Sequence, residues 1–227
     1  MSARLRRRRG VNLTPQGTDP LTRPMSLFFD IGTGVGLSSA TGVRPYLPPL
    51  LAGGLARGDI GIDFDGTDFS FLESTAFLGA IVAVGVVAFL VERSVANRAA
   101  ADKRRGRPRD PGDVLALLLG LGLGALLFAG TLADSGQETW IGLLLGPFCA
   151  VLGWIAIGGL IERVRNRLEP DQAALLTAYA DGAALMLAAI AIFVPPLGYL
   201  AIPGFVLLLL GGRRREGQKY AGLRILR

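Results

Sequence analysis

The sequence has no histidine, one cysteine and only two lysines among its 227 residues. The absence of histidine removes the commonest general base and a common metal ligand. The single cysteine, Cys149, lies in an apolar run and has no partner for a disulfide, a zinc site or thiol catalysis. We interpret Cys149 as a buried core residue, and we expect no catalytic residue, no metal site and no cofactor. An all-carboxylate metal site stays open as an alternative, because the chain has 18 Asp and Glu residues.

Charge is also missing from four long stretches of the chain. Residues 74–91, 114–133, 139–161 and 182–212 contain no charged side chain and are 18, 20, 23 and 31 residues long. A membrane-spanning helix needs about 20 mostly apolar residues. These stretches exclude an ordinary soluble domain, a disordered chain and a nucleic-acid-binding module. They predict an all-α, multi-pass membrane bundle.

The predicted transmembrane domain covers residues 26–212, between basic tails at 1–25 and 213–227. Its apolar segments are 27–55, 74–91, 113–132, 140–161, 172–193 and 197–211. Of the 24 Lys and Arg residues, 22 lie in the two tails and in the loops 92–112 and 162–171. Because basic residues favour the cytoplasmic side, we predict about six spans in a bacterial inner membrane, with both termini cytoplasmic. For the short segment 197–211 we favour a span, with Arg213 reaching the interface, over a re-entrant loop.

The tails predict contact with lipid. Their basic residues suit anionic headgroups, and Tyr220, Leu223 and Leu226 predict an amphipathic C-terminal helix on the membrane surface. A cleaved signal peptide is the weaker interpretation of the N-terminus, because Asp30 interrupts the apolar run that such a peptide needs.

Prolines interrupt the first segment. Pro45, Pro48 and Pro49 fall within five residues, and three prolines so close together cannot sit in an intact helix. We predict two half-helices in segment 27–55 with a break near 43–49, whose freed backbone groups must be enclosed by protein or face a water-filled cavity. Three spans followed by three, with a milder kink at Pro147, also fit an inverted 3+3 repeat of the kind found in transporters.

Closely spaced glycines predict tight helix packing. They occur at 32–36, 120–124 and 142–146, and small residues let membrane helices approach closely. We expect these contacts mainly within one molecule. The same glycine-rich faces could also join two copies into a homo-oligomer.

The loop 60–71 alternates apolar and polar residues around Asp65-Gly66. This pattern predicts a short β-hairpin with its Ile and Phe side chains against the membrane or the bundle. The carboxylates of Asp63, Asp65, Asp68 and Glu73 resemble a calcium loop only superficially, since the glycine position of an EF-hand holds Asp68. We favour a solvated acidic rim.

Ionisable residues at membrane depth are costly, so each one raises a functional hypothesis. Arg44 and Asp181 lie close to the midpoints of their segments, and Asp30 lies near the start of the first segment. Arg44 and Asp181 could form a buried ion pair that fixes helix register. Alternatively, Arg44 could bind an anion through its forked donors, while Asp181 cycles a proton or a cation.

Nearby groups could complete such a site. A half-helix that starts near 46–50 would add a favourable dipole for an anion, and two tyrosines could donate hydroxyl groups. The candidate substrate-binding residues are therefore Arg44, Asp181, Tyr46, Tyr179 and Asp30.

The segment Gly42-Val43-Arg44-Pro45-Tyr46-Leu47 resembles a bacterial membrane-protein family known as domain of unknown function 4126. Members of that family open with Gly-Leu-Arg-x-Tyr/Phe in the first span. They later carry Pro-Glu-Pro, followed by Ser-x-x-Glu-Asp at a late span. Here Leu168-Glu169-Pro170 and Ala180-Asp181 are similar to the later motifs, with Ala in place of the family's Glu. The resemblance, over about 27–211, implies the helical membrane architecture and draws attention to Arg44 and Asp181, but it implies no activity.

We therefore expect a small transporter or channel with a polar site at the membrane midplane, for an anion or an anionic lipid headgroup. The alternative is a non-transporting structural or assembly protein in which Arg44 and Asp181 form only a structural ion pair. An enzyme that acts on lipid is the third hypothesis, and we do not expect this protein to be an enzyme. A rhomboid-like site needs histidine, and an intramembrane aspartyl protease needs two facing aspartates, whereas Asp30 and Asp181 are predicted at different depths.

The predicted topology can be tested with impermeant thiol reagents on intact cells. A cysteine at position 65 should react from outside, whereas a cysteine at position 103 should react only after the membrane is permeabilised. The reverse pattern would contradict the assignment of the basic loops to the cytoplasm.

Overall fold

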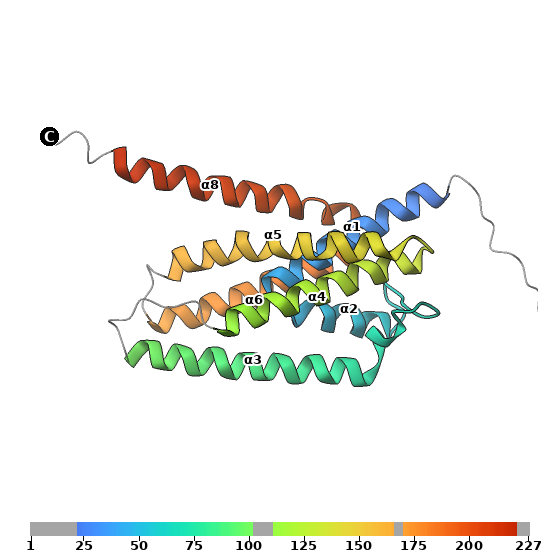
Figure 1. Ribbon diagram of the computed structural model, residues 1–227, viewed down its shortest axis with the longest axis horizontal. Helices are drawn as coiled ribbons and strands as arrows, with labels where there is room; N and C mark the ends of the chain where they lie inside the picture. The colour runs from blue at the N-terminus through green and yellow to red at the C-terminus, as the bar shows by residue number, and fades with distance from the viewer. Residues whose placement is uncertain (1–21, 102–110, 166–169, 222–227) are drawn as a thin grey trace, which may run out of the picture.

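Helices account for all the regular structure in the described part of the chain. The computed structural model describes residues 22–101, 111–165 and 170–221. No strand occurs in these residues, which confirms the all-α class. The elements are α1 (Thr22–Val43), α2 (Leu47–Ala56), the 3-10 helix η1 (Ser70–Glu73), α3 (Thr75–Ala101), α4 (Pro111–Asp134), α5 (Thr139–Arg165), α6 (Pro170–Phe193), α7 (Pro195–Gly198) and α8 (Ala201–Ala221) (Figure 1).

Length and hydropathy show that this is a membrane protein. Val114–Asp134 in α4, Thr139–Ile161 in α5 and Leu175–Phe193 in α6 are long and apolar enough to cross a membrane. Thr75–Val91 of α3 and Pro195–Gly211 of α7 and α8 are apolar but shorter. Large apolar side chains are exposed on the outer faces of these helices. Such a continuous apolar surface suits lipid and not water.

α1 lies at the centre of the bundle. It packs against α4, α5, α6 and α7, and every residue from 32 to 42 is buried. Glycine allows this close approach, since a methyl group on Gly42 would collide with the carbonyl group of Ala150. Hydroxyl groups add hydrogen bonds between helices, as where Ser38 Oγ donates to the carbonyl oxygen of Gly124 at 2.8 Å. The predicted role of glycine in packing within one molecule is thus confirmed for α1.

The predicted break in the first segment is present, and the chain turns back there. α1 ends at Val43, and α2 begins at Leu47 with prolines in its first turn. Proline is tolerated at that position, because the first N–H groups of a helix need no intrahelical acceptor. After α2, Gly61 lines a small pocket together with Asp30 and Thr33 of α1. α1 and α2 therefore form a helical hairpin that enters and leaves the bundle at the same end.

The tip of this hairpin, residues 44–46, lies about half way along the bundle. Thr41 and Gly42, just before the tip, contact Gly120 and Ala150, which lie near the middle of α4 and α5. We call the end that holds residues 57–74 and the turn between α4 and α5 the loop end. The opposite end, where α3 and α5 end and α4 and α6 begin, is the far end (Figure 1).

The hairpin differs from the predicted broken span. Because segment 27–55 returns to the loop end, the first residue of α1 and the last residue of α8 lie at opposite ends of the bundle (Figure 1). The predicted tails 1–21 and 222–227 lie outside the described residues. The count of six spans needs segment 27–55 to cross the bundle, so neither this count nor the inverted repeat is confirmed. α5 is continuous through Pro147, so the fourth segment has no break like that of the first.

The last predicted segment forms a longer helix than expected. α8 packs against α5 through Phe205 and Ala156, runs towards the far end and continues as a helix to Ala221 (Figure 1). It does not turn back as the re-entrant alternative requires.

The predicted β-hairpin at 60–71 is wrong, although its apolar face does pack against the bundle. Ile62, Phe64 and Leu72 are buried and join the core cluster that also contains Leu37 of α1. The chain reaches this position through turns, with positive φ angles of 74° at Gly61 and 73° at Gly66.

In this loop, carboxylates accept hydrogen bonds from backbone N–H groups that would otherwise have donated to a second strand. Asp63 Oδ1 accepts a hydrogen bond from the Asp65 N–H at 2.7 Å, and Glu73 Oε1 accepts one from the Phe64 N–H at 2.6 Å. Side chains of this kind compete locally with sheet pairing. The alternation therefore reflects the burial of Ile62 and Phe64 without a strand partner, while Ile60 and Phe71 are exposed.

The glycine contacts predict a difference between two substitutions in α5. A methyl group at Gly146 would lie 2.6 Å from Cα of Ala125 in α4, whereas one at Gly158 would meet nothing within 4 Å. We expect Gly146→Ala to lower the free energy of unfolding by about 1–3 kcal/mol, since overpacking forces the helices apart. The matched control Gly158→Ala should leave thermal unfolding of the detergent-purified protein unchanged or slightly improved. Equal melting temperatures for the two variants would contradict this packing.

Candidate functional site

The predicted pair of Arg44 and Asp181 is formed. Nε of Arg44, at the tip of the hairpin, lies 2.6 Å from Oδ1 of Asp181, near the middle of α6. The two contacting atoms are buried, although the Arg44 side chain is 12% exposed and that of Asp181 is 33% exposed. Removing one partner of a buried pair costs about 3–5 kcal/mol. Because the Asp181 side chain is partly exposed, we expect the loss of one partner here to cost close to the lower end of that range. The pair ties the hairpin tip to α6.

Two helix ends meet at the tip with opposite partial charges. The last carbonyl groups of α1 carry partial negative charge, which suits the guanidinium group of Arg44 that follows them. The Arg44 N–H donates to the carbonyl oxygen of Ala40 at 3.0 Å. The start of α2 carries partial positive charge, but Pro48 and Pro49 have no N–H to donate. Arg44 is therefore a stronger anion donor than the start of α2.

Of the three other predicted site residues, Tyr46 lies at the hairpin tip, whereas Tyr179 and Asp30 lie away from the ion pair. Tyr46 is half-buried, and its ring packs on α3 so closely that a Cβ on Gly85 would lie 3.1 Å from it. Tyr179 is 75% exposed and lies two residues before Asp181, about 200° around α6, so it points away from the pair. Asp30 lies at the loop end, in another pocket. The structure thus brings together Arg44 and Asp181, while Tyr46, two residues after Arg44, packs on α3. Whether any of the five binds a substrate stays a prediction.

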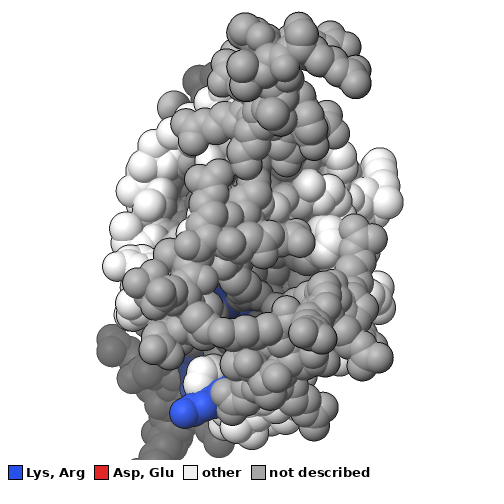
Figure 2. Space-filling model, turned by 90° about the vertical axis from the view of Figure 1, so that its left-hand side faces the viewer, with Lys and Arg blue, Asp and Glu red and all other residues white. Residues whose placement is uncertain are grey.

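Beyond the hairpin tip, the surrounding helices continue towards the far end. α4 begins nine residues before Gly120, α6 begins eleven residues before Asp181, and α3 continues sixteen residues past Gly85. At 1.5 Å per residue they extend about 13–24 Å past the level of the tip. Figure 2 looks onto this end. Where the described surface is visible on this face, it is white and blue.

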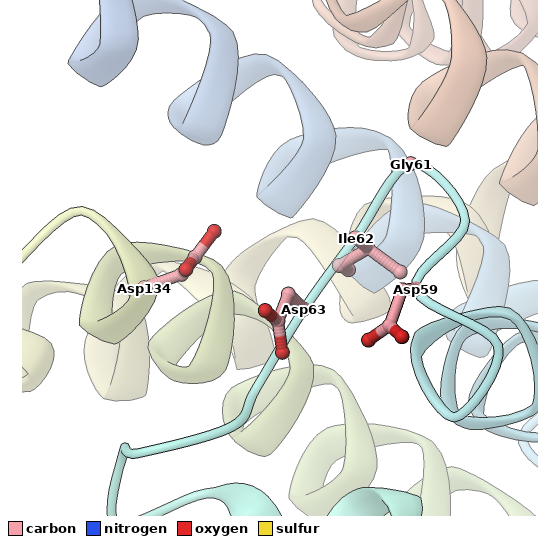
Figure 3. A pocket seen from close by; sticks show the side chains of 5 residues that line it. All are labelled: Asp59, Gly61, Ile62, Asp63 and Asp134. Carbon is pink, nitrogen blue, oxygen red and sulfur yellow. The ribbon is translucent and has the colours of Figure 1, made fainter. Parts of the chain in front are cut away.

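Acidic side chains gather at the loop end instead. A shallow pocket of about 250 Å³ is lined by Asp59, Gly61, Ile62 and Asp63 of the loop and by Asp134 at the end of α4 (Figure 3). A smaller pocket of about 40 Å³ shares Asp134 and adds Asp30 of α1. Sequence reasoning missed Asp134 as a partner of Asp30, because no pattern relates the end of the third apolar segment to the start of the first.

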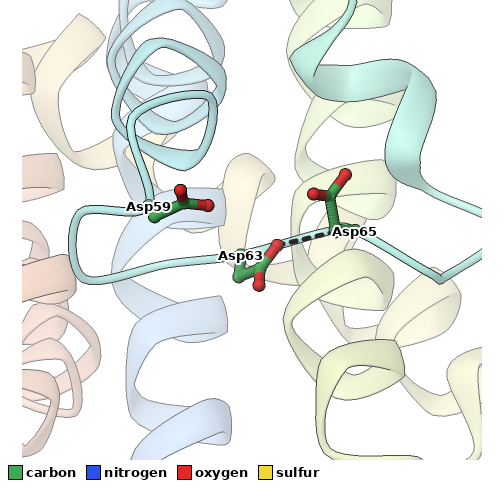
Figure 4. Close-up of side chains that lie close together, drawn as sticks. All are labelled: Asp59, Asp63 and Asp65. Carbon is green, nitrogen blue, oxygen red and sulfur yellow. Dashed lines mark hydrogen bonds between the residues drawn. The ribbon is translucent and has the colours of Figure 1, made fainter. Parts of the chain in front are cut away.

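Three of the loop carboxylates form a cluster. The carboxylate oxygens of Asp59, Asp63 and Asp65 lie within 4.8 Å of one another (Figure 4). Burial raises the pKa of Glu73 nearby, the Phe64 N–H lowers it, and the carboxylates of the cluster raise it further. The cluster includes Asp59, and it lacks Asp68 and Glu73 of the superficial calcium-loop pattern. The arrangement fits the solvated acidic rim.

A family model described as domain of unknown function (DUF4126) matches residues 31–215. The chain belongs to this family. The DUF4126 match covers the hairpin from residue 31 onwards and both members of the Arg44–Asp181 pair, and it confirms the resemblance seen in the sequence. No curated protein and no solved structure matches the chain.

The DUF4126 description carries no activity. Function must therefore be argued from the site. Its most distinctive feature is a charged pair at a broken helix, deep within an apolar bundle.

Proposed function

We propose that this DUF4126 protein is a small transporter or channel, and that Arg44 and Asp181 form its polar site for an anion. The observation that carries the proposal is the position of the pair at the hairpin tip, half way along a bundle of apolar helices. A charge at this depth costs several kcal/mol, so it is usually retained for a function. Broken helices with ionisable residues at mid-depth are also a recurrent plan of membrane transporters.

Charge supports an orientation for this transporter. The loops 92–112 and 162–171 and the tail 213–227 carry 16 of the 24 basic residues, and all three adjoin the far end. The loop end carries the acidic pocket. The tail 1–25, which precedes α1 at the loop end, carries six further basic residues against these 16. By the positive-inside rule, we propose that the far end faces the cytoplasm of a bacterial inner membrane, which replaces the prediction that both termini lie on that side.

The chemistry of the pair suits an anion that can be released again. A guanidinium group presents its N–H donors as a planar fork that matches carboxylate and phosphate oxygens. Asp181 neutralises Arg44 when no ligand is bound, which lowers the cost of keeping the charge at this depth. An incoming anion exchanges with Asp181, and the exposure of the Asp181 side chain gives its carboxylate room to move aside.

The direct contact between the two side chains also favours a second candidate. In that candidate Arg44 and Asp181 only fix the register of the hairpin against α6, and the protein is a structural or assembly partner in the membrane. A buried ion pair commonly has such a role.

Exchange of the two charges separates these functions. We expect Arg44→Asp alone and Asp181→Arg alone to lower the melting temperature, because each leaves two like charges facing each other. The double variant should recover much of the loss, since the pair is restored. It should not recover uptake of radiolabelled inorganic phosphate into proteoliposomes, because the cation then stands on α6 instead of at the hairpin tip.

The control is Arg57→Asp, at an exposed residue of the loop end whose guanidinium group bonds to Thr75. It should leave both stability and phosphate uptake close to those of the wild type. Recovery of both stability and uptake by the exchanged pair would defeat the claim that Arg44 binds the anion and would favour the structural role.

A further inference from the structure

The last turn of α1 is tied to α4 just before the hairpin tip. Thr41 is fully buried, and its hydroxyl group donates to the carbonyl oxygen of Ser38 at 2.7 Å and to that of Gly120 in α4 at 3.2 Å. Three residues earlier in α1, Ser38 Oγ donates to the carbonyl oxygen of Gly124 at 2.8 Å. Two hydroxyl groups of α1 therefore bind two successive turns of α4. We call these four residues, Ser38, Thr41, Gly120 and Gly124, the α4 anchor.

Glycine brings the two backbones into contact at the α4 anchor. A Cβ on Gly120 would lie 2.9 Å from the carbonyl oxygen of Thr41, and one on Gly124 would lie 2.8 Å from its hydroxyl oxygen. A Cβ on Gly122, between these two glycines, would meet nothing within 4 Å. The contact is thus confined to one face of α4. On that face, even a methyl group would push the end of α1 away.

Arg44 follows the α4 anchor within one turn. Its N–H donates to the carbonyl oxygen of Ala40 at 3.0 Å, so its backbone continues the last turn of α1. The backbone of Arg44 is therefore positioned on α4 through Thr41, whereas its side chain reaches Asp181 of α6. The two contacts differ in burial, because Thr41 is fully buried and the Asp181 side chain is 33% exposed.

Binding of an anion requires a support for Arg44 that does not depend on Asp181. The anion and the carboxylate of Asp181 are both acceptors, and they compete for the same guanidinium group. While the anion is bound, Asp181 cannot fix the tip. A binding group must nevertheless be held within about 0.5 Å of its productive position. The support must therefore come from another side of the tip.

We propose that Thr41 is a positioning residue of the anion site, which holds Arg44 in place through the α4 anchor when Asp181 gives way to the anion. This inference rests on the proposed function of Arg44 and adds what positions it. The tip then has a fixed side and a releasable side. Its fixed side faces α4 and also α5, where Gly42 lies against the carbonyl group of Ala150. Its releasable side is the ion pair with α6.

Removal of one hydroxyl group tests the role of Thr41, with a matched control in the same helix. Thr41→Val keeps the shape of the side chain and loses the donor. The control is Thr33→Val, because Thr33 is also buried and also donates both within α1, to Phe29, and to another helix, to Ala191 of α6 at 3.1 Å. Binding of inorganic phosphate is measured by isothermal titration calorimetry on the purified protein in detergent, together with the melting temperature.

We expect Thr41→Val to weaken phosphate binding about tenfold, because a misplaced guanidinium fork loses part of its contact with the anion. Thr33→Val should bind phosphate as the wild type does. Both variants should lower the melting temperature by a similar amount, since each loses one hydrogen bond between helices. Thr41→Ser keeps the hydroxyl group and should retain wild-type binding, which a change in stability alone does not explain.

A second pair of variants tests the α4 anchor without a change in α1. Gly120→Ala should weaken phosphate binding, because its methyl group displaces the backbone of Thr41 and Arg44 with it. Gly122→Ala, two residues away in α4, should not. Asp181→Asn should strengthen binding, since it removes the competing carboxylate while the anchor still holds Arg44.

Equal phosphate binding by Thr41→Val and Thr33→Val, or weaker binding by Asp181→Asn, would overturn the positioning role. In either case a loss of binding in Arg44→Gln would leave the anion site standing. Unchanged binding in Arg44→Gln would instead overturn the anion site itself, and with it the proposed function.

Discussion

An interrupted helix inside a membrane must have its free backbone groups enclosed by protein, and this constraint organises the whole structure. Pro45, Pro48 and Pro49 end α1 and redirect the chain half way along the bundle. The bundle accommodates the break by placing α1 at its centre, where all residues from 32 to 42 are buried. Glycine contacts and serine hydroxyl groups let α4 and α5 close around it. The Arg44–Asp181 pair then fixes the tip against α6, and Tyr46 packs on α3.

Much of this arrangement is encoded in local patterns, and those parts were predictable. Proline spacing located the break, glycine spacing located the close contacts, and the depth of Arg44 and Asp181 pointed to their pairing. The direction of the chain after the break was not predictable, because proline interrupts a helix without fixing the angle between its two halves. The positive-inside rule could not predict this direction either, because the rule assumes that each apolar segment crosses the membrane.

The predictions that failed outside the hairpin failed because tertiary contacts, and not local sequence, decide the structure there. Alternation in 60–71 resembled a strand, because Ile62 and Phe64 are both drawn into the core. The strand was absent because Asp63 and Glu73 bind the N–H groups that would have paired. Tyr179 lies close to Asp181 in sequence yet points away from it, and Asp30 joins Asp134 at the loop end. Only the packed bundle relates such residues, and it leaves Arg44, Asp181 and Tyr46 as the group at the tip.

The hairpin is the feature on which the arrangement of all the other helices depends, and a broken span would instead place the start of α1 at the far end. Pulsed electron resonance between spin labels at Phe29, Asp65 and Arg93, taken in pairs on a Cys149→Ser background, measures this directly. Thr75 and Arg93 are 18 residues apart in α3, which corresponds to about 27 Å along the bundle. The hairpin predicts that position 29 lies clearly closer to position 65 than to position 93. A label at 29 that lies closer to 93 than to 65 would show that the first segment crosses the membrane, and would contradict the re-entrant hairpin.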